Sequence, residues 1–157
     1  MKLLSVIVPC FNEEPVLPIF YEAICKVASE FASRDVACEF IFVDDGSTDR
    51  TLESLRELNS QDSRIRYLSL SRNFGKEAAI FAGLETAMGD YLAIMDADLQ
   101  DPPSYLERMY EAIINEGYDA AATRRISREG EPPIRSFFAR QYYRLIKMIS
   151  KTEFVDG

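Results

Sequence analysis

Residues 91–103 read YLAIMDADLQDPP, a short apolar run that ends in two aspartates one residue apart. Residues 91–95 are uncharged and do not alternate between apolar and polar side chains, which is typical of a parallel strand covered on both faces. Residues 101–102, Asp-Pro, offer an N-cap and a proline for a first helical turn, so we expect a helix to begin there. The pattern predicts a buried strand that carries Asp96 and Asp98 at its carboxyl end.

The two aspartates suit a hard divalent cation. In open α/β sheets, ligands bind at the carboxyl ends of the strands. Side chains two residues apart in an extended segment point the same way, so Asp96 and Asp98 can face one Mg²⁺ or Mn²⁺ ion. Such an ion takes its other ligands from water and substrate phosphates. A solvated acidic turn that only caps a helix is the alternative that the spacing alone leaves open.

The rest of the chain repeats this plan of strand, polar loop and helix. Apolar runs alternate with segments whose apolar residues recur three and four positions apart, and Gly117 is a good helix stop. Five such strands with intervening helices indicate a three-layer α/β domain with a mainly parallel sheet. The expected strands are 3–9, 37–43, 65–71, 91–95 and 118–123, and the expected helices are 15–31, 51–58, 77–87, one from 101 and a last one at 135–151.

Composition restricts the chemistry that the chain can perform. Its 157 residues suffice for about one domain, and no apolar run approaches the roughly 20 residues of a transmembrane helix. The three cysteines lack metal-type spacing, which fits a reducing compartment. Because the chain has no histidine, a Ser-His-Asp triad and His-ligated zinc are excluded. Carboxylates, Lys or Arg side chains and a bound metal ion remain.

Charge is unevenly distributed and divides the chain in two. The net charge is -8, yet residues 124–151 hold eight basic and two acidic residues, so the remainder carries -14. We expect an acidic core domain at 1–126, followed at 127–157 by a Gly/Pro-containing linker and a basic helix. Aromatic and cationic residues interleave along 135–151, which suits a helix lying on an anionic membrane surface. A core-packed helix with a basic outer face is an equal alternative.

Polar residues gather where the predicted strands end. Right-handed crossovers bring the carboxyl ends of parallel strands to one edge of the sheet. Carboxylates for a metal and for a base or ribose, together with Arg or Lys for phosphate, match the needs of a nucleoside-diphosphate ligand. The residues in question are Asn12, Glu13, Asp44, Asp45, Arg72, Lys76, Asp96, Asp98 and Arg124.

Three ordered motifs at these strand ends resemble the family 2 glycosyltransferases of the GT-A fold. They are SVIVP with FNE at 5–13, VDDGSTD at 43–49 and DAD at 96–98. Four further motifs are similar to polyprenyl-phosphate glycosyltransferases, the group of bactoprenol glucosyltransferases and dolichol-phosphate mannose synthases. These are SRNFGKEA at 71–78, DLQDPP at 98–103, TRR at 123–125 and SREGE at 127–131. The resemblance covers nearly the whole chain.

The resemblance implies a nucleotide pocket lined by Pro9, Phe11, Glu13 and Asp45, with Asp44 supporting the same turn. Phe11 stands where the family more often has a tyrosine, so the pocket would lack the tyrosine hydroxyl. Each of these residues has a structural alternative: Glu13 can start a helix favourably, Asp45 can serve only the turn before a glycine, and Phe11 can simply pack.

The resemblance also implies a metal site and phosphate contacts. Asp96 and Asp98 would hold Mg²⁺ or Mn²⁺ on the diphosphate, with Ala97 between them in the donor pocket and Gln100 as a further ligand or supporting group. Arg124 would meet donor or acceptor phosphate, and Lys76 is a second candidate for phosphate. We therefore expect Asp98 and Arg124 to be the catalytic residues. Gln100 and Lys76 have structural alternatives of equal weight, and Arg125 and Arg128 fit a solvated or membrane-facing charge run.

The implied activity is inverting transfer of a hexose from a UDP- or GDP-sugar to a polyprenyl phosphate at the cytoplasmic face of the membrane. The acceptor is already an anion, so no strong general base is needed. No nucleic-acid partner is expected, and a homo-oligomer is open. Family members continue further and commonly carry transmembrane helices, so the chain resembles a donor-binding half or a truncated product.

Several rival functions stay open at this point. One is a nucleotide-sugar-binding domain without transfer activity, and another is a family 2 transferase with a saccharide acceptor. A sugar-nucleotide-forming nucleotidyltransferase is disfavoured because the loop at 9–14 is acidic and lacks glycine. A receiver-like module is disfavoured by the DAD and REG motifs.

Overall fold

Strands and helices alternate strictly along the part of the chain that the structure describes. A computed structural model describes residues 1–123, and its first compact unit, Met1–Asp119, contains every element. The predicted Arg124 contact, the linker at 127–133 and the helix at 135–151 lie outside the described residues. The elements are β1 (Lys2–Cys10), α1 (Leu17–Ala32), β2 (Val36–Asp44), α2 (Thr51–Gln61), β3 (Ile65–Ser69), α3 (Lys76–Thr86), β4 (Tyr91–Ile94) and α4 (Tyr105–Glu116).

The four strands form one parallel sheet in the order β3-β2-β1-β4. Its register sets Cys10 of β1 beside Asp44 of β2, and Asp44 beside Ser69 of β3. On the other side of β1, Ile7 pairs with Ile94, and the amide of Met95 continues the ladder by donating to the carbonyl of Ile7. All four strands therefore end at one edge of the sheet, as the sequence predicts.

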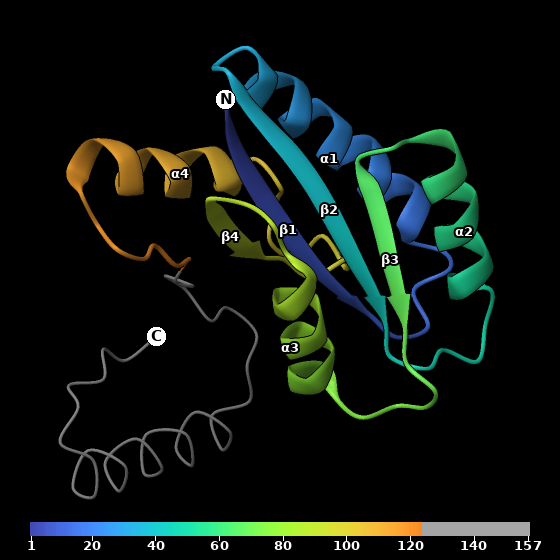
Figure 1. The fold of residues 1–157 in the computed structure, drawn as a ribbon. Helices are drawn as coiled ribbons and strands as arrows, with labels where there is room; N and C mark the ends of the chain where they lie inside the picture. The colour runs from blue at the N-terminus through green and yellow to red at the C-terminus, as the bar shows by residue number, and fades with distance from the viewer. Residues whose placement is uncertain (124–157) are drawn as a thin grey trace, which may run out of the picture. The chain divides into compact units, whose positions relative to one another are not determined.

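The two faces of the sheet are covered by different helices, so the predicted three layers are confirmed (Figure 1). Alternate residues of β2 point to opposite faces, as the pleat requires. Phe40 and Phe42 belong to the large core beneath α1, α2 and α4, whereas Ile41 and Val43 pack against α3. Gly83 lets α3 approach the sheet, because a Cβ at this position would lie 2.4 Å from Cγ2 of Ile7.

A buried carboxylate connects three strands at the opposite end of the sheet. Glu39 of β2 accepts hydrogen bonds from Ser5 Oγ at 2.5 Å, the Met88 amide at 2.9 Å and Arg66 Nη1 at 3.0 Å. Burial alone would raise the pKa of Glu39, but these three donors outweigh it and hold the pKa below its usual value. Each polar group in the network thus has a partner, as buried polar groups require.

The predicted fifth strand is wrong. Residues 118–123 form no strand in the described part of the chain, and Tyr118 is 57% exposed. Three of these six residues are alanines, which have a low strand propensity and little apolar surface to bury. A good helix stop at Gly117, where φ is +74°, ends α4 as predicted but does not start a strand.

The surroundings of β4 also differ from the prediction. Leu92 and Ile94 are about half exposed, because α3 packs on β1 and β2 and leaves one face of β4 uncovered within the described residues. The helix after β4 begins at Tyr105 with Ser104 as its N-cap, rather than at 101. The two prolines before Ser104 accept hydrogen bonds from the first helical amides through their carbonyls, so a turn precedes the helix.

Candidate donor-binding site

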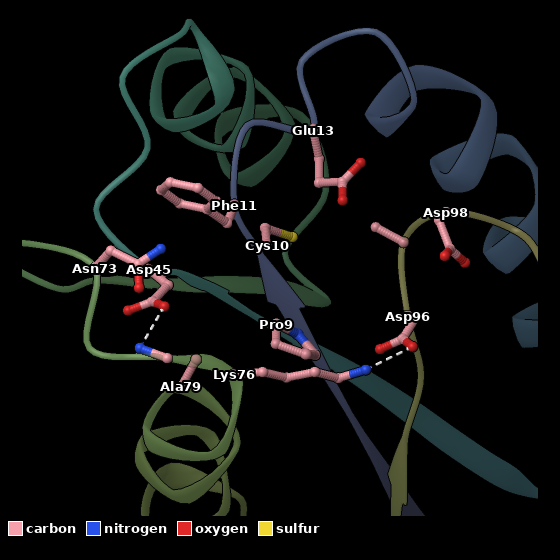
Figure 2. Close-up of a pocket in the computed structure, with 12 residues that line it drawn as sticks. Pro9, Cys10, Phe11, Glu13, Asp45, Asn73, Lys76, Ala79, Asp96 and Asp98 are labelled. Atoms are coloured by element: carbon pink, nitrogen blue, oxygen red, sulfur yellow. Dashed lines mark hydrogen bonds and ion pairs between the residues drawn. The ribbon is translucent and has the colours of Figure 1, made fainter. Parts of the chain in front are cut away.

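A cavity opens at the carboxyl edge of the sheet, where the loops after β1, β2, β3 and β4 meet. Its volume is about 290 Å³, which is close to the lower end for small-molecule sites. Figure 2 shows Phe11 and Asn73 on one side of it and Asp96 and Asp98 on the other. The lining residues are Pro9, Cys10, Phe11, Glu13, Asp45, Asn73, Gly75, Lys76, Ala79, Asp96, Ala97 and Asp98.

Asp45 joins two of these loops. Its side chain is buried, and its two carboxylate oxygens accept hydrogen bonds from the amides of Phe74 at 2.8 Å and Gly75 at 2.9 Å. Its own amide donates to the carbonyl of Cys10 at 2.8 Å. Asp45 therefore fixes the loop that leads into α3, and each oxygen keeps a second lone pair for a ligand in the cavity.

Gly46 makes this close approach of the loops possible. Its φ of +68° is in the left-handed region, and a Cβ here would lie 2.4 Å from the carbonyl carbon of Arg72. Glycine is the one residue that tolerates both conditions at little cost. The glycine of the VDDGSTD motif is therefore required by the backbone itself, independently of any ligand contact.

Asp44 lies beneath the cavity rather than on its lining. It is almost completely buried, and its oxygens accept hydrogen bonds from the Ser47 amide at 3.0 Å and from Ser69 Oγ at 3.1 Å. These contacts hold the turn after β2 and the end of β3 together. The geometry fits a residue that supports the turn.

The loop after β1 is held against the loop after β2, and this contact positions Glu13. Asn12 adopts a φ of +57°, its Oδ1 accepts from the Thr48 amide at 2.8 Å, and its amide donates to Ser47 Oγ at 2.9 Å. The Glu13 amide donates to Thr51 Oγ1 at 2.8 Å. The backbone of the FNE motif is therefore fixed by the VDDGSTD motif and by Thr51 at the start of α2, although these lie more than thirty residues away.

The carboxyl group of Glu13 faces a concentration of negative charge. Partial burial raises its pKa, and the nearby carboxylates of Asp98, Asp49 and Asp96 raise it further. The thiol of Cys10 is buried in the same region, and burial likewise raises its pKa well above the usual range. Like charges crowded in this way create a favourable place for a cation.

Asp96 and Asp98 both line the cavity, at the end of β4. Lys76 Nζ forms an ion pair with Asp96 Oδ2 at 2.6 Å, drawn as a dashed line in Figure 2, and Asp98 Oδ1 accepts from the Gln100 amide at 3.0 Å. Ala97 between the aspartates is buried in the core. Within residues 1–123, no three His, Cys, Asp or Glu side chains are grouped closely enough to hold a metal by themselves.

The donor set nevertheless fits a hard divalent cation. Two carboxylates that share a cavity are sufficient for Mg²⁺ or Mn²⁺ when substrate phosphates and water complete the coordination. Asp96 and Asp98 supply hard oxygen donors, and a cation between them would relieve the charge crowding at Glu13. Gln100 does not line the cavity, and its ligand role stays a prediction.

Eight of the predicted site residues lie on the cavity lining, and the structure adds four that sequence reasoning did not select. The eight are Pro9, Phe11, Glu13, Asp45, Lys76, Asp96, Ala97 and Asp98, and the additions are Cys10, Asn73, Gly75 and Ala79. Asn73 and Gly75 belong to the SRNFGKEA motif, so the motif contained a signal for them. Whether any of these residues contacts a ligand stays a prediction.

Known proteins with similar sequences are glycosyltransferases. Residues 5–154 match the family described as glycosyl transferase family 2. The prophage bactoprenol glucosyl transferase homolog of Escherichia coli is 37% identical over the whole chain, which covers 50% of its length. The undecaprenyl-phosphate 4-deoxy-4-formamido-L-arabinose transferase of Aeromonas hydrophila is 38% identical over 82% of the chain and 39% of its own length. The chain thus spans about half, or less, of these relatives.

Solved structures agree with the fold. A mannosyltransferase from Pyrobaculum calidifontis, in complex with GDP-Man and Mn²⁺, is 26% identical with a TM-score of 0.51 over 60% of the chain and 27% of its own. Residues 1–349 of TarS from S. aureus superpose with a TM-score of 0.60 over 84% of the chain and 38% of that structure, at 23% identity. The described fold is therefore that of the GT-A glycosyltransferases.

Proposed function

The chain belongs to glycosyltransferase family 2, and on that premise we propose that its cavity binds a nucleotide sugar for transfer to a polyprenyl phosphate. The observation that carries the proposal is the meeting of acidic and cationic side chains at one edge of the sheet, where Glu13, Asp45, Lys76, Asp96 and Asp98 line a single cavity. Because the chain spans about half of its curated relatives, transfer is proposed for the whole protein and donor binding for this chain.

The nucleoside occupies the side of the cavity near Phe11 and Asn73. The half-exposed ring of Phe11 offers a stacking surface for a base, and Asn73 offers an amide that both donates and accepts. The free lone pairs of the Asp45 carboxylate accept a hydrogen bond from the base or the ribose. Glu13 and Pro9 complete the wall of this pocket.

The diphosphate occupies the opposite side, between Lys76 and the two aspartates. Asp96 and Asp98 would hold Mg²⁺ or Mn²⁺ there, with Gln100 as a candidate further ligand. When bound, the metal stabilises the negative charge that develops on the leaving nucleoside diphosphate. The Mn²⁺ and GDP-Man in the Pyrobaculum mannosyltransferase support this assignment.

The transfer itself needs few protein groups. An oxygen of the acceptor phosphate forms a bond to C1 of the sugar, the bond from C1 to the diphosphate oxygen breaks with its electron pair staying on the diphosphate, and the configuration at C1 inverts. The acceptor oxygen is already anionic, so the absence of histidine from the chain costs the reaction nothing. The residues of this chain orient the donor, and Arg124 is proposed to contact a phosphate.

A polyprenyl carrier places the reaction at a membrane surface. The names of both curated relatives refer to such a carrier, bactoprenol in one and undecaprenyl phosphate in the other. The basic and aromatic sequence of residues 135–151 is proposed to lie on the anionic cytoplasmic face. None of the helices in residues 1–123 combines the length and apolar character needed to cross a bilayer.

A second candidate function is nucleotide-sugar binding without transfer. The half-length match favours it, since the chain corresponds to only about half, or less, of each relative that is named as a transferase.

A transfer assay tests the proposal directly. The whole protein, as wild type and as Asp98→Asn, is incubated with Mn²⁺, a short polyprenyl phosphate and radiolabelled UDP-glucose or GDP-mannose, and lipid-linked sugar is counted. We expect transfer by the wild type, with Asp98→Asn retaining less than about a tenth of the rate. A fully active Asp98→Asn variant would remove Asp98 from the metal site, and donor binding without turnover in the wild type would favour the second candidate.

A further inference from the structure

Lys76 forms an ion pair inside the cavity with a residue of the proposed metal site. Its Nζ lies 2.6 Å from Oδ2 of Asp96, and the two residues come from different elements, the start of α3 and the segment after β4. Figure 2 shows the Lys76 side chain extended past Pro9 toward Asp96. The ammonium group of Lys76 therefore occupies one oxygen of Asp96 that would otherwise be available to the proposed metal ion.

Among the residues that line the cavity in the described part of the chain, Lys76 is the single cation. Four carboxylates share that lining, and the two oxygens of one of them, Asp45, accept hydrogen bonds from backbone amides. The other three, Glu13, Asp96 and Asp98, also line the cavity, and Lys76 forms an ion pair with one of them, Asp96. In the absence of ligand, Lys76 thus partly neutralises the group of carboxylates that a metal would otherwise neutralise.

The position of Lys76 is fixed by its neighbour. The amide of Gly75 donates to Asp45 at 2.9 Å, and Gly75 is the N-cap of α3. The first turn of α3 is thereby held at the cavity, and the flexible side chain of Lys76 needs only to rotate to reach other groups on the lining. Its side chain is 53% exposed and that of Asp96 is 44% exposed, so the pair is open to competition by a stronger cation.

On the premise of the donor and metal site proposed above, we propose that Lys76 is an internal counter-ion of Asp96 that the metal displaces toward the donor diphosphate. An oxygen that accepts from an ammonium group at 2.6 Å is not free to coordinate a metal in the same direction. The lysine therefore weakens metal binding when no nucleotide is present. A bound diphosphate offers the ammonium another anionic partner, and this removes the competition.

The consequence is coupling between the two ligands. Nucleoside diphosphate increases the affinity for Mn²⁺ by drawing Lys76 away from Asp96, and by reciprocity Mn²⁺ increases the affinity for nucleotide by the same factor. Lys76 then acts as a positioning residue for the metal and as a binding residue for phosphate. It also lowers the occupancy of the site by metal alone.

The test measures Mn²⁺ binding to the 157-residue chain by isothermal titration calorimetry, with and without UDP or GDP, in the wild type and in Lys76→Met. Methionine keeps the length and apolar stem of lysine and removes its charge. Lys2→Met is the matched control, because Lys2 pairs with Asp90 at 2.8 Å and does not line the cavity. Far-UV circular dichroism and the melting temperature check that both variants are folded.

We expect Lys76→Met to bind Mn²⁺ alone about two- to fivefold more tightly than the wild type, and to bind nucleotide more weakly at saturating Mn²⁺. The factor by which nucleotide improves Mn²⁺ affinity should fall toward one, while Lys2→Met should change neither affinity. An unchanged or weaker Mn²⁺ affinity in Lys76→Met, when the wild type binds both ligands, would overturn this inference alone. Failure of the wild type to bind UDP or GDP with Mn²⁺ would overturn the proposed function and this inference together.

Discussion

Replacement of Asp45 by alanine should loosen the loop that precedes α3 and destabilise the protein. In the structure the two oxygens of Asp45 accept the amides of Phe74 and Gly75 at 2.8 and 2.9 Å, and the residue is 3% exposed. A hydrogen bond to a charged group contributes about 1.5 to 3 kcal/mol. Because the amides of this surface loop can recover water in the variant, we expect a loss of about 2 to 4 kcal/mol in the free energy of unfolding.

Urea denaturation followed by circular dichroism measures this loss. With a slope of about 2 kcal/mol per M, the midpoint should fall by about 1 to 2 M. Asp90→Ala is the matched control, since Asp90 also accepts a backbone amide, that of Leu3 at 2.9 Å, but its side chain is 39% exposed. That variant should lose clearly less stability than Asp45→Ala, because an exposed ion pair contributes little. Equal losses in the two variants would refute a loop-holding role for Asp45.

Three further predictions follow from buried or close contacts elsewhere in the fold. Glu39→Ala leaves Arg66 and two other donors without their acceptor, so urea denaturation should show a loss of about 2 to 4 kcal/mol; a loss below 1 kcal/mol would contradict the network. The Asp62 carboxyl is hydrogen-bonded by Arg64, which lowers its pKa from 3.8 to about 2. The ionised Asp62 carboxylate should therefore contribute about 1 to 2 kcal/mol to the free energy of unfolding above about pH 4, and this contribution should be lost as the pH falls toward 2. If Asp62→Asn shows the same loss of stability between pH 4 and pH 2 as the wild type, Asp62 is not its source. Gly83→Ala should lower the melting temperature, because its Cβ would overlap Ile7, and no change would mean that α3 shifts freely.

The general fold could be predicted from the sequence because its signals are local. Apolar runs ending in polar loops identified the four strands that form, and Gly117 identified the end of α4. The predicted fifth strand was wrong because three of the residues 118–123 are alanines, which offer little apolar surface to bury against a neighbouring strand. The exposure of Leu92 and Ile94 could not be predicted, since it depends on which strands α3 covers.

The sequence predicted most of the residues that share the cavity, but not the contacts among them. Parallel strands end at one edge, so Glu13, Asp45, Asp96 and Asp98 could be expected to share a cavity. The sequence did not reveal that Asp45 holds a loop or that Lys76 pairs with Asp96. Both contacts join residues twenty or more positions apart through side-chain directions, which a pattern of residue types does not encode.

Metal-dependent nucleotide binding tests the central proposal most directly. The melting temperature of the chain is recorded with UDP, GDP and CDP, each with and without Mn²⁺, for the wild type, Asp96→Asn and the exposed control Asp35→Asn. At a hundredfold excess over the dissociation constant, one nucleotide should raise the wild-type melting temperature by about 5 to 10 °C. The rise should require Mn²⁺, persist in Asp35→Asn and vanish in Asp96→Asn. No rise with any nucleotide, or an equal rise in Asp96→Asn, would contradict a donor site at this edge of the sheet.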